Sequence, residues 1–180
     1  MLKKIVIAGA AVVVGLAGAI ALQPSEFRVT RSAVIPAPPA AVFAQINDLR
    51  RWEAWSPWEK IDPAMKKSFD GPAAGPGASF SWTGNSSVGD GRVTIVESRA
   101  PEVVRIKLEM LKPMAATNDV QFTLAPEGDE TRVTWSMAGR SGFVAKALHL
   151  VMNMDRMVGG QFEKGLASLK TIAEAEAKKS

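Results

Sequence analysis

The sequence predicts an α+β fold in which a curved antiparallel sheet of about seven strands wraps a long C-terminal helix, with a transmembrane helix at the N-terminus. Three observations support this prediction. The chain starts with an uncharged apolar run, its middle alternates apolar and polar residues with a period of two, and its end has apolar residues three and four apart. The expected division is residues 1–22 as an anchor or signal segment, 23–26 as a linker and 27–177 as one folded domain.

The apolar run extends from Ile5 to Leu22 without a charged residue. As a helix it would be about 27 Å long, just enough to cross a hydrocarbon core of about 30 Å. Lys3 and Lys4 precede it and would remain on the cytoplasmic side, so the rest of the chain would lie outside. A secretory signal peptide is the alternative, since residues 17–19 and 19–21 both have the A-x-A spacing of a cleavage site. The apolar region of a signal peptide is usually only about 7–15 residues long, which favours an uncleaved anchor.

The folded domain begins with a predicted strand from Phe27 to Ile35, where apolar and polar residues alternate. Prolines end this strand, and the helical spacing of the apolar residues that follow predicts a short helix from Pro39 to about Leu49. Three tryptophans lie within residues 52–58, where Pro57 makes the segment too irregular for one continuous helix.

Short strands with one apolar face fill residues 65–137, and motifs such as Gly89-Asp90-Gly91 mark the turns between them. The apolar members of the clearest strands are Phe80 and Trp82; Val104, Ile106, Leu108 and Met110; Val120, Phe122 and Leu124; and Val133, Trp135 and Met137. Such a series indicates an antiparallel meander, and its single apolar face has to be covered by another element.

The C-terminal segment supplies this cover. It has no proline from Phe143 to Ala177, and its apolar residues recur at three and four positions, which predicts one long helix. Gly159 and Gly160 lie in the middle of that helix and would weaken it, so a kink is expected there. A helix on a curved sheet leaves a space between the two, and that space is a natural ligand site.

Composition narrows the classes of function. Of 180 residues 47% are hydrophobic, which is enough for a sizeable core. The chain has 22 basic and 18 acidic residues, and two of the basic ones are Lys3 and Lys4. The remaining basic residues form no dense cluster of the kind that binds nucleic acid, so no nucleic-acid partner is expected. The absence of cysteine excludes disulfides and thiolate metal ligands.

Several stretches resemble a known family. Ala37 to Ala44, Ile46 to Asp48 and Trp52 to Trp58, with Val133 to Trp135 and Met157 to Leu169, are similar to the polyketide cyclase/dehydrase and lipid-transport proteins. These belong to the START-like (SRPBCC, Bet v 1-type helix-grip) superfamily. The resemblance covers residues 27–173 and implies a helix-grip fold. Many bacterial members also carry an N-terminal apolar segment, which implies a bacterial inner-membrane protein with its domain on the periplasmic or extracellular side. Members bind lipids, hormones, quinones or polyketides and some are enzymes, but no universal catalytic motif exists to carry over.

The candidate ligand-binding residues are large apolar side chains expected to face the space between sheet and helix. Tryptophan offers a flat apolar face with an N–H donor, and methionine adapts its shape to varied ligands. The alternative for each residue is ordinary packing in the core. The candidates are Trp55, Trp58, Phe80, Trp82, Met110, Phe122, Trp135, Met137, Met154 and Val158.

No catalytic residue, metal site or cofactor is predicted. His149 is the only histidine, so a second histidine ligand for a metal is lacking. Four carboxylates flank the tryptophan segment, but their spacing does not bring two of them together for acid–base chemistry. They are Glu53, Glu59, Asp62 and Asp70.

The function expected is a membrane-anchored or exported protein that binds a lipid or another apolar small molecule between the sheet and the C-terminal helix. One alternative is a cyclase- or dehydratase-like enzyme, which would need an ionisable residue with a perturbed pKa facing the cavity. Another is an envelope interaction module, which would have no pocket and an exposed apolar patch instead. If the N-terminal segment were cleaved, the protein would be secreted. The ligand's identity and the oligomeric state are not predicted.

Overall fold

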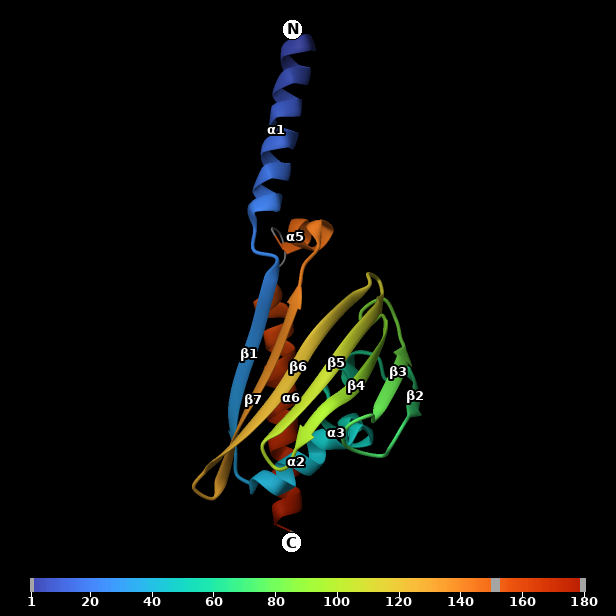
Figure 1. The fold of residues 1–180 in the computed structure, drawn as a ribbon, viewed down its shortest axis with the longest axis vertical. Helices are drawn as coiled ribbons and strands as arrows, with labels where there is room; N and C mark the ends of the chain where they lie inside the picture. Colours follow the sequence, from blue (N-terminus) through green and yellow to red (C-terminus); the bar gives the residue numbers. More distant parts are fainter. Residues whose placement is uncertain (1, 150–152, 179–180) are drawn as a thin grey trace.

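A computed structural model describes residues 2–149 and 153–178 of the protein. The side chains of His149 and of several residues in the first helix are not described. Figure 1 shows an extended helix followed by one sheet with helices on a single face. The elements in chain order are α1 (Leu2–Leu22), β1 (Glu26–Ile35), α2 (Pro39–Asn47), the 3-10 helix η1 (Leu49–Arg51), α3 (Trp52–Trp55), α4 (Pro57–Ile61), β2 (Lys66–Asp70), β3 (Ser79–Thr83), β4 (Asp90–Arg99), β5 (Val103–Lys112), β6 (Ala116–Glu127), β7 (Glu130–Arg140), α5 (Phe143–His149) and α6 (Met154–Ala177).

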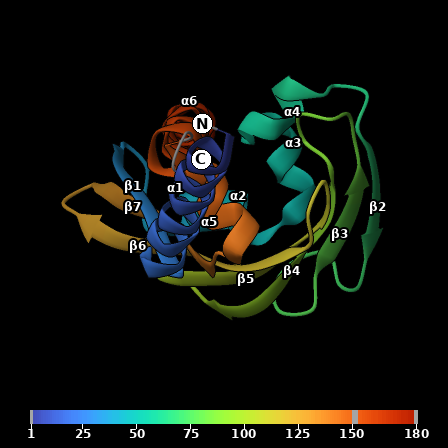
Figure 2. The same cartoon turned by 90° about the horizontal axis from the view of Figure 1, so that it is seen from above.

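The seven strands form one antiparallel sheet in the order β1-β7-β6-β5-β4-β3-β2, which confirms the predicted meander. Neighbouring pairs such as Phe122 with Trp135 and Val120 with Met137 align apolar side chains on one face, because side chains alternate along each strand. Figure 2 shows the sheet curving around α6 and the short helices α2 to α4. The apolar face is therefore the concave one.

The short helices are positioned by hydrogen bonds from buried tryptophans. Trp52 Nε1 donates to the Ile46 carbonyl oxygen at 2.9 Å, and Trp55 Nε1 donates to the Gln45 carbonyl oxygen at 3.2 Å. Pro57 begins a new helix because it has no N–H to continue the preceding one. The prediction that residues 52–58 form no continuous helix is confirmed, and both tryptophans are fixed against α2.

The prediction of one helix from Phe143 to Ala177 is wrong. The structure has two helices, with α5 ending at His149 and α6 beginning at Met154. Asn153 caps α6 by accepting a hydrogen bond from Arg156 N at 2.9 Å, and an asparagine cap favours the start of a new helix over continuation. Residues 150–152 between the two helices, which include the predicted apolar position Val151, lie outside the described residues.

The glycines expected to kink the helix lie inside α6, which continues through them. A Cβ atom at Gly159 would lie 2.1 Å from Arg31 Nη2, so the missing side chain makes room for that guanidinium. Arg31 Nε donates to Glu163 at 2.6 Å and Arg31 Nη2 to Asp155 at 2.9 Å, which joins β1 to α6. The hydrogen bond to Asp155, followed by that to Glu163, raises the pKa of Arg31 above its usual range.

The N-terminal segment is helical, and Figure 1 shows α1 extending away from the sheet. Lys146 Nζ of α5 donates to the Ala21 carbonyl oxygen at 3.4 Å near the end of α1. Over the residues that the structure describes, no helix combines the length and the apolar character needed to cross a membrane. The transmembrane helix expected from Ile5 to Leu22 is therefore not confirmed.

Candidate ligand cavity

A cavity of about 310 Å³ lies between the concave face of the sheet, the segment α3–α4 and α6. Small-molecule pockets span roughly 300–1,000 Å³, so this one suits a small ligand. Figure 2 shows the elements that enclose it, with α6 on one side and β3 and β4 on the other. Its lining residues are Trp52, Ser56, Trp58, Glu59, Met65, Phe80, Trp82, Ser87, Val88, Val93, Ile106, Leu108, Met110, Asn118, Val120, Trp135, Met137, Met154, Val158 and Phe162.

The structure brings most of the sequence-predicted candidates to this cavity. The lining includes Trp58, Phe80, Trp82, Met110, Trp135, Met137, Met154 and Val158. The other two, Trp55 and Phe122, are each 0% exposed and pack against each other with ring centroids 6.0 Å apart, so they belong to the core beneath the cavity. Ligand binding by the eight lining residues stays a prediction.

Stacked aromatic rings form the wall at α6. The rings of Trp135 and Phe162 are parallel within 9°, with centroids 4.1 Å apart, and Trp58 meets both of them edge-on. Gly165 allows this close approach, because a Cβ atom there would lie 2.7 Å from Trp135 Cζ3. Trp135 is only 2% exposed and also packs against Phe122, with ring centroids 4.7 Å apart, so aromatic neighbours fix its position.

Trp135 also has a buried hydrogen-bond donor without an acceptor. Its Nε1 is inaccessible and has no hydrogen-bond partner among the described residues. A buried donor without an acceptor costs about 1–3 kcal/mol, and the surrounding aromatic faces are only weak acceptors. The ring is therefore held by packing alone, and its N–H is the least satisfied polar group that the described interior contains.

The polar part of the lining was missed by the sequence analysis. It consists of Ser56, Glu59, Ser87 and Asn118. A signal for Asn118 was available, because it lies two positions before Val120 and continues the inward-facing row of β6. No comparable signal existed for Ser56 or Glu59, since they lie in the irregular helical segment where no period applies.

Glu59 is the charged member of the described lining, and it is already neutralised. Its Oε2 atom accepts from Lys67 Nζ of β2 at 2.8 Å, and the two side chains are only 15% and 13% exposed. Charge-assisted hydrogen bonds of this kind are short and strong. The pair joins the edge strand β2 to α4 beside the cavity that Glu59 lines.

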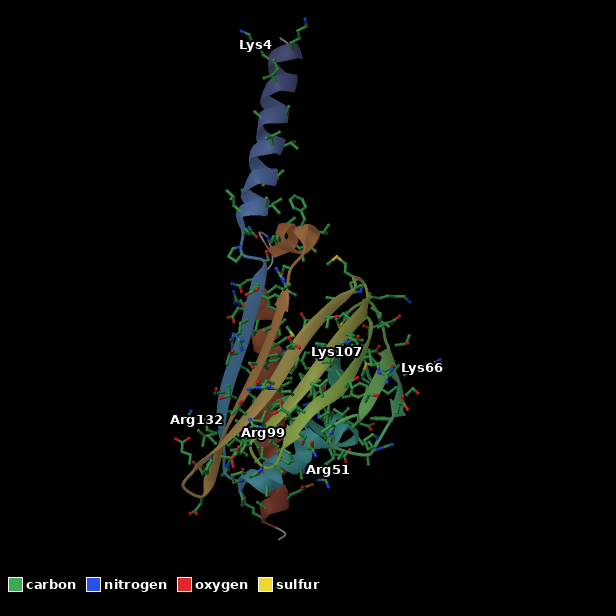
Figure 3. All side chains as sticks on the ribbon, in the orientation of Figure 1. Lys4, Arg51, Lys66, Arg99, Lys107 and Arg132 are labelled. Carbon is green, nitrogen blue, oxygen red and sulfur yellow. The ribbon has the colours of Figure 1, made fainter. Side chains whose placement is uncertain are left out.

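Two further basic residues of the sheet, Lys107 and Arg132, lie on its outer face. Lys107 pairs with Glu109 at 2.6 Å, and Arg132 pairs with Glu127 at 2.9 Å. Figure 3 shows Lys66, Lys107 and Arg132 on three separate strands, apart from one another. Among the described residues, the cavity lining has no lysine or arginine.

The four carboxylates near the tryptophan segment are not brought together. Glu59 pairs with Lys67, whereas Asp62 accepts from the backbone N–H groups of Ala64 and Asn85 at 3.2 and 2.7 Å. Asp70 meets Arg92 at 3.3 Å, and Glu53 is exposed on α3. The described residues include no group of three His, Cys, Asp or Glu that could hold a metal ion, and the side chain of His149 lies outside them.

Comparison with known proteins places the chain in a family. A family model described as polyketide cyclase/dehydrase and lipid transport matches residues 26–174. Comparison with curated proteins found no match.

Solved structures share the fold at low sequence identity. TTHA0849 from Thermus thermophilus is 17% identical, with 84% of this chain and 99% of that chain covered and a TM-score of 0.60. CV1439 from Chromobacterium violaceum is 16% identical, with the same coverage and a TM-score of 0.59. Aha1 from Colwellia psychrerythraea, described as a dimer, is 14% identical over 80% of this chain and 93% of its own, with a TM-score of 0.56. At such identities the likeness shows the fold alone.

The family model covers nearly all of the chain that follows α1, and the sheet wrapped on α6 is the fold that this family implies. The chain therefore belongs to the polyketide cyclase/dehydrase and lipid-transport family.

Proposed function

We propose that this protein binds a lipid or another apolar small molecule in the cavity between the sheet and α6. The observation that carries the proposal is the cavity itself, about 310 Å³ of space lined largely by aromatic, aliphatic and methionine side chains. Burial of apolar ligand surface there is favourable by about 25 cal/mol for each Å² removed from water. The family description, which includes lipid transport, agrees with this class of ligand.

The cavity also makes the alternative, an envelope interaction module, less favoured than ligand binding. Such a module is expected to pack its interior solidly and to present an apolar patch outside. The space beneath α6 is instead open and reaches the aromatic core. Ligand binding accounts for that space, whereas an interaction module leaves it unexplained.

The test is a variant that fills the cavity. Val158 of α6 lines it, so Val158→Trp should occupy the space and lower the affinity for 1-octanol at least tenfold, measured by titration calorimetry on the full-length chain. The control is Val144→Trp on α5, an exposed position outside the lining that should leave the affinity unchanged. Equal affinities of both variants and the wild type would refute binding in this cavity, and an absence of any binding would refute the proposed function.

We also propose that the N-terminal segment tethers the domain to a bacterial inner membrane or exports it. Support comes from the uncharged residues that follow Lys3 and Lys4, and from the exposed apolar side chains of Val13, Val14 and Leu16 on α1. Expression of the full chain in a bacterial host, followed by membrane fractionation and mass measurement of the product, tests this proposal. Intact protein in the membrane fraction would indicate a tether, and a shortened product outside the inner membrane would indicate export with cleavage. Intact protein in the cytosol would refute both.

A further inference from the structure

The polar residues of the lining narrow the class of ligand beyond an apolar molecule. Within the described lining, Glu59 is paired with Lys67 and Ser87 is exposed to solvent. The other two polar residues, Ser56 and Asn118, are 5% and 8% exposed, and neither side chain has a hydrogen-bond partner among the residues that the structure describes. Buried polar side chains in proteins are nearly always hydrogen-bonded, so unmatched ones in a cavity call for a ligand.

Asn118 is open to the cavity. Of the buried side-chain nitrogen and oxygen atoms that the structure describes, Trp135 Nε1 is the one that is both inaccessible and unpartnered. The amide of Asn118 has no partner, yet it is not sealed in this way, so a molecule in the cavity can reach it. An asparagine amide supplies donors and an acceptor, and it can therefore pair with a hydroxyl, a carbonyl or an amide.

The neighbouring strand is shaped around this side chain. Gly139 of β7 lies opposite Asn118 of β6 in the sheet register. A Cβ atom at Gly139 would lie 2.1 Å from Asn118 Oδ1, so a glycine is needed for the amide to lie where it does. The arrangement keeps an unpaired amide at the end of the inward-facing row of β6, where a hydrophobic residue would otherwise complete the core.

Charge in the lining argues against an ionised ligand. No lysine or arginine of the described chain lines the cavity, so a carboxylate or phosphate would lose its hydration without gaining a cation. A cationic ligand would compete for Glu59 with Lys67, which already donates to it at 2.8 Å. A neutral ligand avoids both costs.

We infer that the cavity selects an uncharged apolar molecule with a hydrogen-bonding oxygen group, and that Asn118 binds that group. This inference rests on the proposed function. It names a ligand class, which includes long-chain alcohols, ketones, esters and amides and excludes free fatty acids in their ionised form.

The experiment compares matched probes on the full-length chain at neutral pH. 1-Octanol, octanamide, octane and octanoate share one chain and differ in the end group, and their dissociation constants are measured by competition with a bound fluorescent apolar dye. 1-Octanol and octanamide should bind about tenfold more tightly than octane, which corresponds to one hydrogen bond to a buried amide. Octanoate should bind more weakly than both.

Two variants assign the effect to the amide. Asn118→Leu keeps the branched shape of the side chain but removes the hydrogen-bonding group, so it should abolish the preference for 1-octanol over octane while octane still binds. Thr117→Val changes the adjacent, outward-facing residue of β6 and should keep the preference. Urea unfolding of both variants shows whether they remain folded.

The outcomes distinguish a failure of the Asn118 inference from a failure of the proposed function. If octane binds but all four probes bind equally, or if octanoate binds best, the inference on Asn118 is overturned and the proposed function stands. The same holds if Asn118→Leu retains the preference while folded. If no probe binds, octane included, the proposed function fails and takes the inference with it.

Discussion

A single methyl group added at Gly165 should strain the wall of the cavity. Gly165 lies in α6 against Trp135, and a Cβ atom there would lie 2.7 Å from Trp135 Cζ3 and 3.0 Å from Pro57 Cδ. Neither neighbour can retreat easily, because Trp135 is stacked on Phe162 and Pro57 is buried at the start of α4. Gly165→Ala therefore overpacks the interior instead of filling a void.

The magnitude follows from two opposing terms. Overpacking a well-packed core costs about 1–3 kcal/mol, whereas replacing an interior helical glycine by alanine contributes about 1 kcal/mol of stability. Gly160→Ala provides the matched control, since a Cβ atom at Gly160 meets nothing within 4 Å and the variant gains the helical term alone. The helical term cancels between the two variants, so Gly165→Ala should be less stable than Gly160→Ala by about 1–3 kcal/mol.

Urea unfolding of the full-length chain, followed by far-ultraviolet circular dichroism, measures the difference. For a protein of this size each kcal/mol corresponds to about 2–4 °C in Tm, so thermal unfolding provides a second reading. The affinity for 1-octanol should also change in Gly165→Ala, because Trp135 lines the cavity. Equal stability of the two alanine variants would refute the view that Gly165 is required by the packing of Trp135.

Three further predictions concern the contacts that hold α6 and α3 in place. Gly159→Ala should unfold at a lower urea concentration than Gly160→Ala, since its methyl group displaces the Arg31 guanidinium. Equal urea midpoints of the two variants would contradict this. The hydrogen bond from Arg31, which outweighs desolvation, lowers the pKa of Asp155, so the stability that this pair contributes is complete above about pH 4 and is lost as the pH falls through the lowered pKa. Arg31→Met should therefore flatten the decrease in urea midpoint at acid pH, and an unchanged acid profile would be the contrary result. Trp55→Phe should lower the free energy of unfolding by about 1–3 kcal/mol because the Gln45 carbonyl oxygen loses a buried donor, and a wild-type midpoint would show that this hydrogen bond is dispensable.

The sequence was most informative where a local period determines the direction of side chains. Alternation along β6 and β7 placed Val120, Phe122, Trp135 and Met137 on one face, and a sheet needs no further information to bury that face. Alternation cannot tell which of these residues border an empty space. Trp55 and Phe122 lie in solid core because α3 packs directly on the sheet there, and this distance between elements depends on the whole fold.

Individual side-chain contacts, both local and between distant segments, were the part that the sequence could not predict. The cap that separates α6 from α5 depends on one asparagine side chain, Asn153, in a segment whose apolar spacing otherwise favours a continuous helix. The pair of Glu59 and Lys67 joins a short helix to an edge strand, and no periodicity connects the two residues. Asn118 could have been placed on the inward face by extending the alternation of β6, but its lack of a partner appears only in three dimensions.

Arg31 gives the edge of the sheet a means of resisting misassembly. β1 is an outer strand with one unpaired side, the kind of edge on which other chains can add and aggregate. Arg31 lies on the inward face of that strand, where it forms ion pairs with Asp155 and Glu163 of α6. A shift of β1 by one residue along β7 would turn Arg31 toward solvent and break both ion pairs, so these contacts favour the native register over the neighbouring ones. The guanidinium thus fixes the position of β1. As an inward-pointing charge on an edge strand, it also makes the free edge a poor template for a second sheet.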